Sequence, residues 1–119
     1  MLDRAQRLQR QFFTHANVAW EPPVDIVETD DTLQMHVALP GVSADAITIA
    51  LDPAGITISA ARAFPCRGEG QIHRLEIPYG RFERHIGLSL GDPYSPLELA
   101  GKSLQDGILT LTFRRKEGQ

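Results

Sequence analysis

The chain has 119 residues, of which 42% are hydrophobic and 23% charged, and its size allows one soluble domain with a real core. It contains no run of about 20 apolar residues that would span a membrane, no secretory signal, and no overall basic charge that would support nucleic-acid binding. The single cysteine, Cys66, excludes an internal disulfide framework and favours a reducing, cytoplasmic location.

The net charge of −3 is unevenly distributed along the chain. Residues 21–60 contain seven acidic residues and no lysine or arginine, whereas residues 61–119 contain nine basic and seven acidic residues. An acidic first half and a more basic second half can attract each other within a chain or between subunits. The same distribution also fits a mixed, solvated surface, and the charges alone leave both interpretations open.

Residues 1–19 are expected to form a helical arm and a linker. Apolar residues at intervals of three and four predict an amphipathic helix over residues 2–13. Because so short a helix is not stable alone, its apolar face needs its own domain, another subunit, an unfolded protein or a membrane surface. An organelle transit peptide is the least favoured interpretation. The residues expected to make these contacts are Leu2, Leu8, Phe12, Phe13 and Trp20.

From Val24 onward the apolar residues recur with a period of two, which is typical of half-buried strands. Ser43 is expected to cap one helical turn, and Ala63–Gln71 and Gly91–Pro96 are expected to be loops. Seven or so short strands separated by turns predict an all-β, immunoglobulin-like sandwich. The expected strands are Val24–Glu28, Leu33–Leu39, Ile47–Leu51, Ile56–Ala60, Ile72–Ile77, Phe82–Leu88, Leu97–Gln105 and Ile108–Phe113.

Charged and aromatic residues are concentrated in Ile72–Leu88, a segment that belongs either to a catalytic cleft or to a surface that pairs with other charges. The four histidines and Cys66 stand in no metal-ligand spacing, and the sequence has no GxSxG, P-loop or GxGxxG motif. We therefore expect no enzyme activity, no cofactor and no metal, and favour the interface. Cys66 is either an incidental thiol or the site of a disulfide with a second subunit.

Six motifs support a family assignment. They are Pro23-Val24-Asp25-Ile26, Leu39-Pro40-Gly41-Val42, the hairpin Ile47–Ala60, His73-Arg74-x-Glu76, Tyr79-Gly80-x-Phe82-x-Arg84 and Asp106-Gly107-Ile108-Leu109. In this order they resemble the small heat-shock proteins of the α-crystallin/Hsp20 family. The resemblance implies an α-crystallin domain over residues 20–116, followed by a short tail at residues 117–119.

The resemblance implies an ATP-independent holdase that binds partly unfolded client proteins and limits their aggregation. It also implies a homodimer as the building block, with small oligomers left open. In the family the arginine matching Arg84 lies at the dimer interface, and in bacterial and plant members the loop matching Ala63–Gln71 carries a strand that pairs beside Val24–Glu28 of the neighbour. The residues assigned to the dimer interface are Arg84, Phe82, Glu76 and Arg74. Those assigned to a client or peptide groove are Ile47, Ile49, Leu51, Leu99 and Ser103.

The sequence departs from the family pattern in three places. The chain printed here has no Ile-x-Ile/Val motif after Lys116, and its arm is short; both features argue against large cages and leave the groove open to clients. Ser103 replaces the usual alanine, and the usual Leu-Pro after the arginine strand is absent. Two other functions remain: a co-chaperone or scaffold of the p23/CS type that acts through one dedicated partner, and a membrane-surface protein that uses the arm helix.

Overall fold

The computed structural model describes residues 19–66, 68, 70–88 and 96–115. The helix predicted over residues 2–13, with Leu2, Leu8, Phe12 and Phe13, lies outside the described residues. So do residues 91–95 of the second predicted loop and the tail at residues 117–119.

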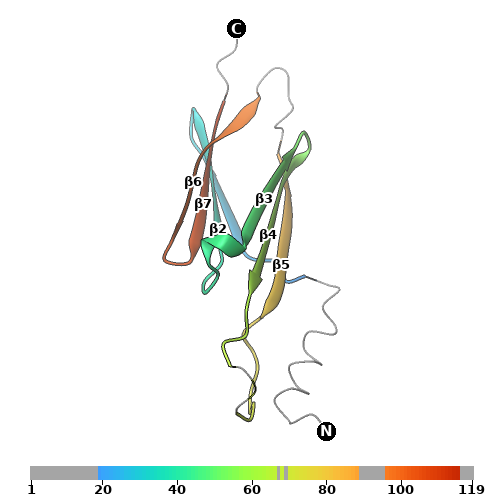
Figure 1. The fold of residues 1–119 in the computed structure, drawn as a ribbon. Coiled ribbons are helices and arrows are strands. Elements are labelled where there is room, and N and C mark those ends of the chain that lie inside the picture. Colours follow the sequence, from blue (N-terminus) through green and yellow to red (C-terminus); the bar gives the residue numbers. More distant parts are fainter. Residues whose placement is uncertain (1–18, 67, 69, 89–95, 116–119) are drawn as a thin grey trace.

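Seven strands form two antiparallel sheets, which confirms the all-β sandwich for the described part of the chain (Figure 1). One sheet has the order β1-β2-β7-β6 and the other β3-β4-β5, with the 3-10 turn η1 (Ala44–Ala46) leading into β3. The strands are β1 (Val24–Glu28), β2 (Thr32–Ala38), β3 (Ile47–Asp52), β4 (Gly55–Arg62), β5 (Gly80–Gly87), β6 (Leu97–Gln105) and β7 (Ile108–Arg115). No helix among the described residues is long and apolar enough to cross a membrane.

The core lies between the two sheets and follows from the period-two pattern of the sequence. Directly opposite residues of an antiparallel pair share a face, so the apolar residues of β2 and β7 point together toward β4 and β5. Met35, Val37, Leu111 and Phe113 are fully buried, as is Ile56 on the facing sheet. The burial of these side chains supplies the main force that holds the sheets together.

Two local predictions are wrong. Ile72–Ile77 has the pattern of a strand but belongs to no strand in the described chain. The backbone groups of a strand need a partner strand, and the single chain supplies none there. Ser43 precedes η1 but makes no side-chain cap hydrogen bond in the described structure, although the predicted helical turn is present.

The Asp106-Gly107 pair makes the turn between β6 and β7. Both residues have positive φ, 52° and 78°, as a tight hairpin turn of this kind requires. A side chain on Gly107 would place its Cβ 2.9 Å from the Cα of Pro40, so the glycine also allows the hairpin to approach the turn after β2. The amide of Leu39 donates a hydrogen bond of 2.7 Å to the Gly107 carbonyl and joins the two turns.

Replacement of a core side chain in β7 tests the location of the core. We expect Leu111→Ala to lower the free energy of unfolding by about 2–5 kcal/mol, because it leaves a cavity between the sheets. Ile108→Ala is the matched control: Ile108 lies on the same strand, is 39% exposed, and should cost less than about 1 kcal/mol. Urea unfolding of both variants measures the difference, and equal losses would contradict this account of the core.

Candidate interaction surfaces

Residues Trp20–Pro23, here called the strap, cross from one sheet to the other. The Trp20 amide donates to the Arg81 carbonyl and the Glu83 amide donates to the Trp20 carbonyl, both at 2.9 Å, so Trp20 pairs with the outer edge of β5. Its indole Nε1 donates to the Tyr79 carbonyl at 2.9 Å. At the other end of the strap, the Pro23 carbonyl accepts the Ala38 amide of β2 at 3.0 Å. The strap therefore joins the two sheets at the edge formed by β5 and β1.

Arg84 holds the middle of the strap. It stands opposite the buried Ile58, so it lies on the inner face of the edge strand β5. Its Nη1 donates to the Pro22 carbonyl at 3.1 Å, and its Nε lies 3.8 Å from Oε2 of Glu21. Pro22 is fully buried, whereas the Arg84 side chain is 36% exposed. The structure thus gives Arg84 partners within its own chain and leaves part of it accessible at the sandwich edge.

The other residues assigned to the dimer interface occupy two different places. Phe82 is 6% exposed and belongs to the core, on the same face of β5 as Arg84. Arg74 and Glu76 lie in the segment before β5 and form an exposed ion pair of 3.1 Å. The sequence alone does not distinguish the buried Phe82 from the exposed Arg74 and Glu76, because all three lie in the same charged and aromatic segment, Ile72–Leu88.

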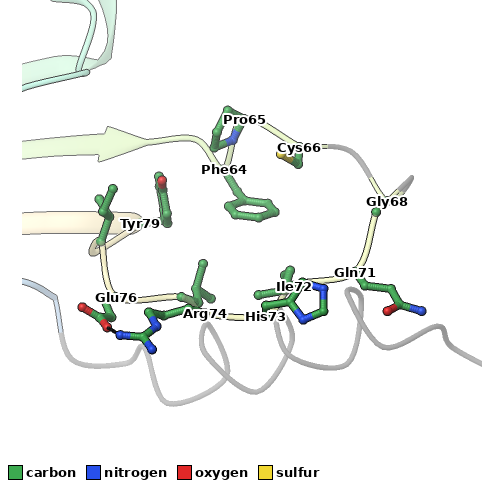
Figure 2. A pocket seen from close by; sticks show the side chains of 13 residues that line it. Phe64, Pro65, Cys66, Gly68, Gln71, Ile72, His73, Arg74, Glu76 and Tyr79 are labelled. Carbon is green, nitrogen blue, oxygen red and sulfur yellow. Dashed lines mark hydrogen bonds and ion pairs between the residues drawn. The ribbon is translucent and has the colours of Figure 1, made fainter.

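The segment between β4 and β5, residues 63–79, projects from one end of the sandwich and is here called the 63–79 loop (Figure 1). It encloses a mainly apolar pocket of about 380 Å³. Figure 2 shows Phe64 and Pro65 on one side of this pocket and the run from Ile72 to Glu76 on the other. Ile77 is 56% exposed, and Cys66 is an exposed free thiol. The loop therefore presents apolar side chains outside the core.

β1 is an edge strand whose inner face is incompletely covered. Ile26 stands opposite the fully buried Met35 and so shares the inner face, yet it is 47% exposed. The facing sheet has three strands against four, and along β1 only Val24 packs against the core. Asp25, Val27 and Glu28 are exposed on the same strand. Among the described residues β1 thus offers an unpaired backbone edge, an apolar surface and the acid Asp25, whereas Glu28 is paired with Arg115 at 2.9 Å.

The opposite side of the sandwich contains a smaller groove of about 200 Å³ between β3 and β6. Ile47 and Ser103, two of the five residues assigned to a client groove, line it together with Lys102 and Leu104. Ile49 and Leu99 do not line this groove but, like Ile47, pack against the core, and Leu51 is 49% exposed farther along β3. The structure therefore brings two of the five assigned residues together in this groove.

Lys102 is a groove residue that the sequence did not single out. The register of β6 against β7 shifts between Leu99 and Gly101, which places Lys102 opposite the buried Leu111 and so on the inner face. A cation that points inward from an edge strand discourages uncontrolled pairing of that edge. The sequence contains a signal that could have indicated the bulge, because the leucines at 97, 99 and 104 change from odd to even positions across Gly101.

The described ranges contain no cluster of three His, Cys, Asp or Glu residues that could hold a metal ion. His85 is engaged on the outer face of its sheet, where its Nδ1 lies 2.9 Å from the Thr57 hydroxyl. The described part of the chain thus has open strand edges, a groove and a loop with apolar side chains.

The sequence profile of the Hsp20/alpha crystallin family matches residues 25–119. The chain belongs to this family. Its sequence is 29% identical over 102 residues to Small heat shock protein C4 of Rickettsia felis, covering 85% of this chain and 61% of that relative. The chain thus spans about three fifths of the length of this curated relative.

Solved structures of small heat-shock proteins share the fold. HSP18.5 from E. histolytica has a TM-score of 0.69 at 20% identity, covering 85% of this chain and 93% of that one, a likeness that shows the fold alone. Heat shock protein 16.0 from Schizosaccharomyces pombe has a TM-score of 0.67 at 26% identity, covering 82% of this chain and 75% of that one.

The contacts of Arg84 predict a local effect of its removal. We expect Arg84→Ala to loosen the strap and to lower the free energy of unfolding by about 1 kcal/mol, a small value because the side chain is partly solvated. Emission from Trp20, the only tryptophan, should shift to the red as its contacts weaken. Arg81→Ala is the matched control, because among the described residues the Arg81 side chain pairs only with the exposed Glu83, and its backbone contact with Trp20 is kept. Identical emission and stability in both variants would contradict the role of Arg84.

Proposed function

We propose that this protein is an ATP-independent holdase that binds partly unfolded proteins and limits their aggregation. Membership of the Hsp20/alpha crystallin family supports a chaperone role in general. The observation that carries the finer proposal is the exposure of apolar side chains outside the core, on β1, on the 63–79 loop and on β3. Exposed apolar surface next to an unpaired strand edge suits the capture of unfolded chains by burial and backbone pairing.

We propose that the building block is a homodimer formed by strand exchange. In the single chain Ile72–Ile77 has a strand pattern without a partner, and β1 has an edge without a partner strand among the described residues. Both segments also carry apolar side chains outside the core, Ile77 on the loop and Ile26 and Val27 on β1. Pairing of Ile72–Ile77 with β1 of a second copy would satisfy both backbones and cover the exposed Ile26.

Arg84 has a second role in this dimer. It lies at the β5–β1 side of the sandwich, where the strap runs, and its exposed part can meet an acid of the neighbouring copy in addition to Glu21. Arg74 and Glu76 would enter the interface with the exchanged segment, and Phe82 would support it from the core. The exposed free thiol of Cys66 fits a reducing compartment, so we place this activity in the cytoplasm. The p23-type scaffold is not favoured, since the family match is to Hsp20.

The holdase activity has a direct test. At less than one chain per client, the protein should suppress heat-induced light scattering of an aggregation-prone client in the absence of ATP. An inert protein at equal mass is the control. Suppression that requires ATP, or scattering equal to that with the inert protein, would overturn the proposal.

The strand exchange is tested by a proline in the exchanged segment. We expect Leu75→Pro to raise the dimer dissociation constant about tenfold, because proline has no N–H to donate and one or two lost backbone hydrogen bonds are worth about 1–2 kcal/mol. Gln71→Pro, in the same loop but outside Ile72–Ile77, is the control. Sedimentation across a dilution series measures both variants, and equal constants would count against the exchange.

A further inference from the structure

Arg62, the last residue of β4, binds three separate segments at the base of the 63–79 loop. Its Nε donates to the Pro78 carbonyl at 2.9 Å, and its Nη2 donates to the same oxygen. Its Nη1 donates to the Pro40 carbonyl at 2.6 Å. The guanidinium also lies over two rings, 5.5 Å from the centroid of Tyr79 and 4.9 Å from that of Phe82. The planar fork of an arginine allows this combination, which a lysine cannot reproduce.

Arg62 lies where the 63–79 loop leaves the sandwich and where it returns. Arg62 pairs with Gly80 in the last rung of the β4–β5 ladder, so the loop begins and ends beside the guanidinium. Pro78 is on the returning side of the loop, whereas Pro40 follows β2 in the other sheet. Arg62 therefore fixes the returning end of the loop to both sheets at once. Phe64 and Tyr79 close the base further, with their rings at 79° and their centroids 5.2 Å apart.

The turn after β2 is shaped to receive this side chain. Gly41 has a φ of +78°, and a Cβ at that position would lie 3.1 Å from Cδ of Arg62. A glycine at this point thus permits both the turn and the close approach of the arginine stem. The contacts come from the turn after β2, the end of the 63–79 loop and β5. No ion pair is among the described contacts of Arg62, so its charge interacts with carbonyl oxygens and aromatic faces.

We propose that Arg62 is a positioning residue for dimer formation: it sets the direction in which the 63–79 loop leaves the sandwich and so presents Ile72–Ile77 to the β1 edge of a second copy. This inference rests on the proposed strand exchange. A loop whose base is fixed loses less conformational freedom when its segment pairs with a partner. Removal of Arg62 therefore weakens association through loss of preorganisation, while the core of each sandwich remains in place.

The chain carries two single probes that report the position of the loop. Trp20 is the only tryptophan and lies against β5, and Cys66 is the only cysteine and is exposed on the loop. An acceptor dye on Cys66 allows time-resolved energy transfer from Trp20 to measure the distribution of distances between loop and sandwich. The measurement is made in the Leu75→Pro background at low concentration, so that association does not contribute to it.

We expect Arg62→Ala to broaden this distance distribution and, in the otherwise unchanged chain, to raise the dimer dissociation constant about tenfold. Arg62→Lys should fall between Arg62→Ala and the unchanged protein, because an ammonium group cannot hold both carbonyls in the same geometry. Arg81→Ala, which removes an arginine near the same end of β5, should change neither quantity. Urea unfolding in the Leu75→Pro background supplies the stability of each variant without the dimer.

The outcomes separate this inference from the function on which it rests. If Leu75→Pro leaves the dimer intact, the strand exchange itself is wrong, and with it any positioning for that exchange. If Leu75→Pro dissociates the dimer but Arg62→Ala matches Arg81→Ala in distance distribution and dissociation constant, the role of Arg62 alone is overturned. A weakened dimer with an unchanged distance distribution and a lowered unfolding midpoint would likewise show that Arg62 is merely structural.

Discussion

The structure depends on the burial of two apolar faces of unequal width. Four strands face three, so the residues at the centre of the wide sheet, such as Met35 and Phe113, are fully covered while Ile26 at its margin is not. The period-two pattern that creates the core continues into β1, where the facing sheet no longer supplies a cover. The apolar pattern that stabilises the domain thus also leaves exposed apolar side chains on β1, which a second polypeptide can bury.

Two arginines join segments that lie outside the strands. Arg84 binds the strap where it crosses between the sheets. Arg62 binds the Pro78 carbonyl at the end of the 63–79 loop and the Pro40 carbonyl in the turn after β2. In both cases the guanidinium donates to backbone carbonyls that lie just outside a strand and have no ladder partner. Such contacts satisfy carbonyl groups that have no partner in a strand ladder, and they help to define the geometry of these segments.

The sequence predicts the strands well because their signal is local. Alternation in β2 and β7, and the turn residues Asp106 and Gly107, determine both where the strands lie and which face is buried. Ile72–Ile77 has the same local signal but no strand in the chain, because pairing depends on which edges the fold leaves open. The role of Arg62 was missed for a related reason: its partners Pro40 and Pro78 are distant in sequence and contribute only their carbonyl groups. The bulge that turns Lys102 inward coincides with a break in the period at Gly101, a signal that the prediction of one continuous strand did not use.

The central claim is that Ile72–Ile77 pairs with β1 of a second copy. Hydrogen exchange of the backbone amides, measured across a dilution series, tests this claim most directly. Strand pairing protects amides that the single chain leaves without a ladder, so protection of residues 72–77 should rise with protein concentration together with the fraction of dimer. Exchange of these amides that stays the same from the monomeric to the dimeric range would contradict the account.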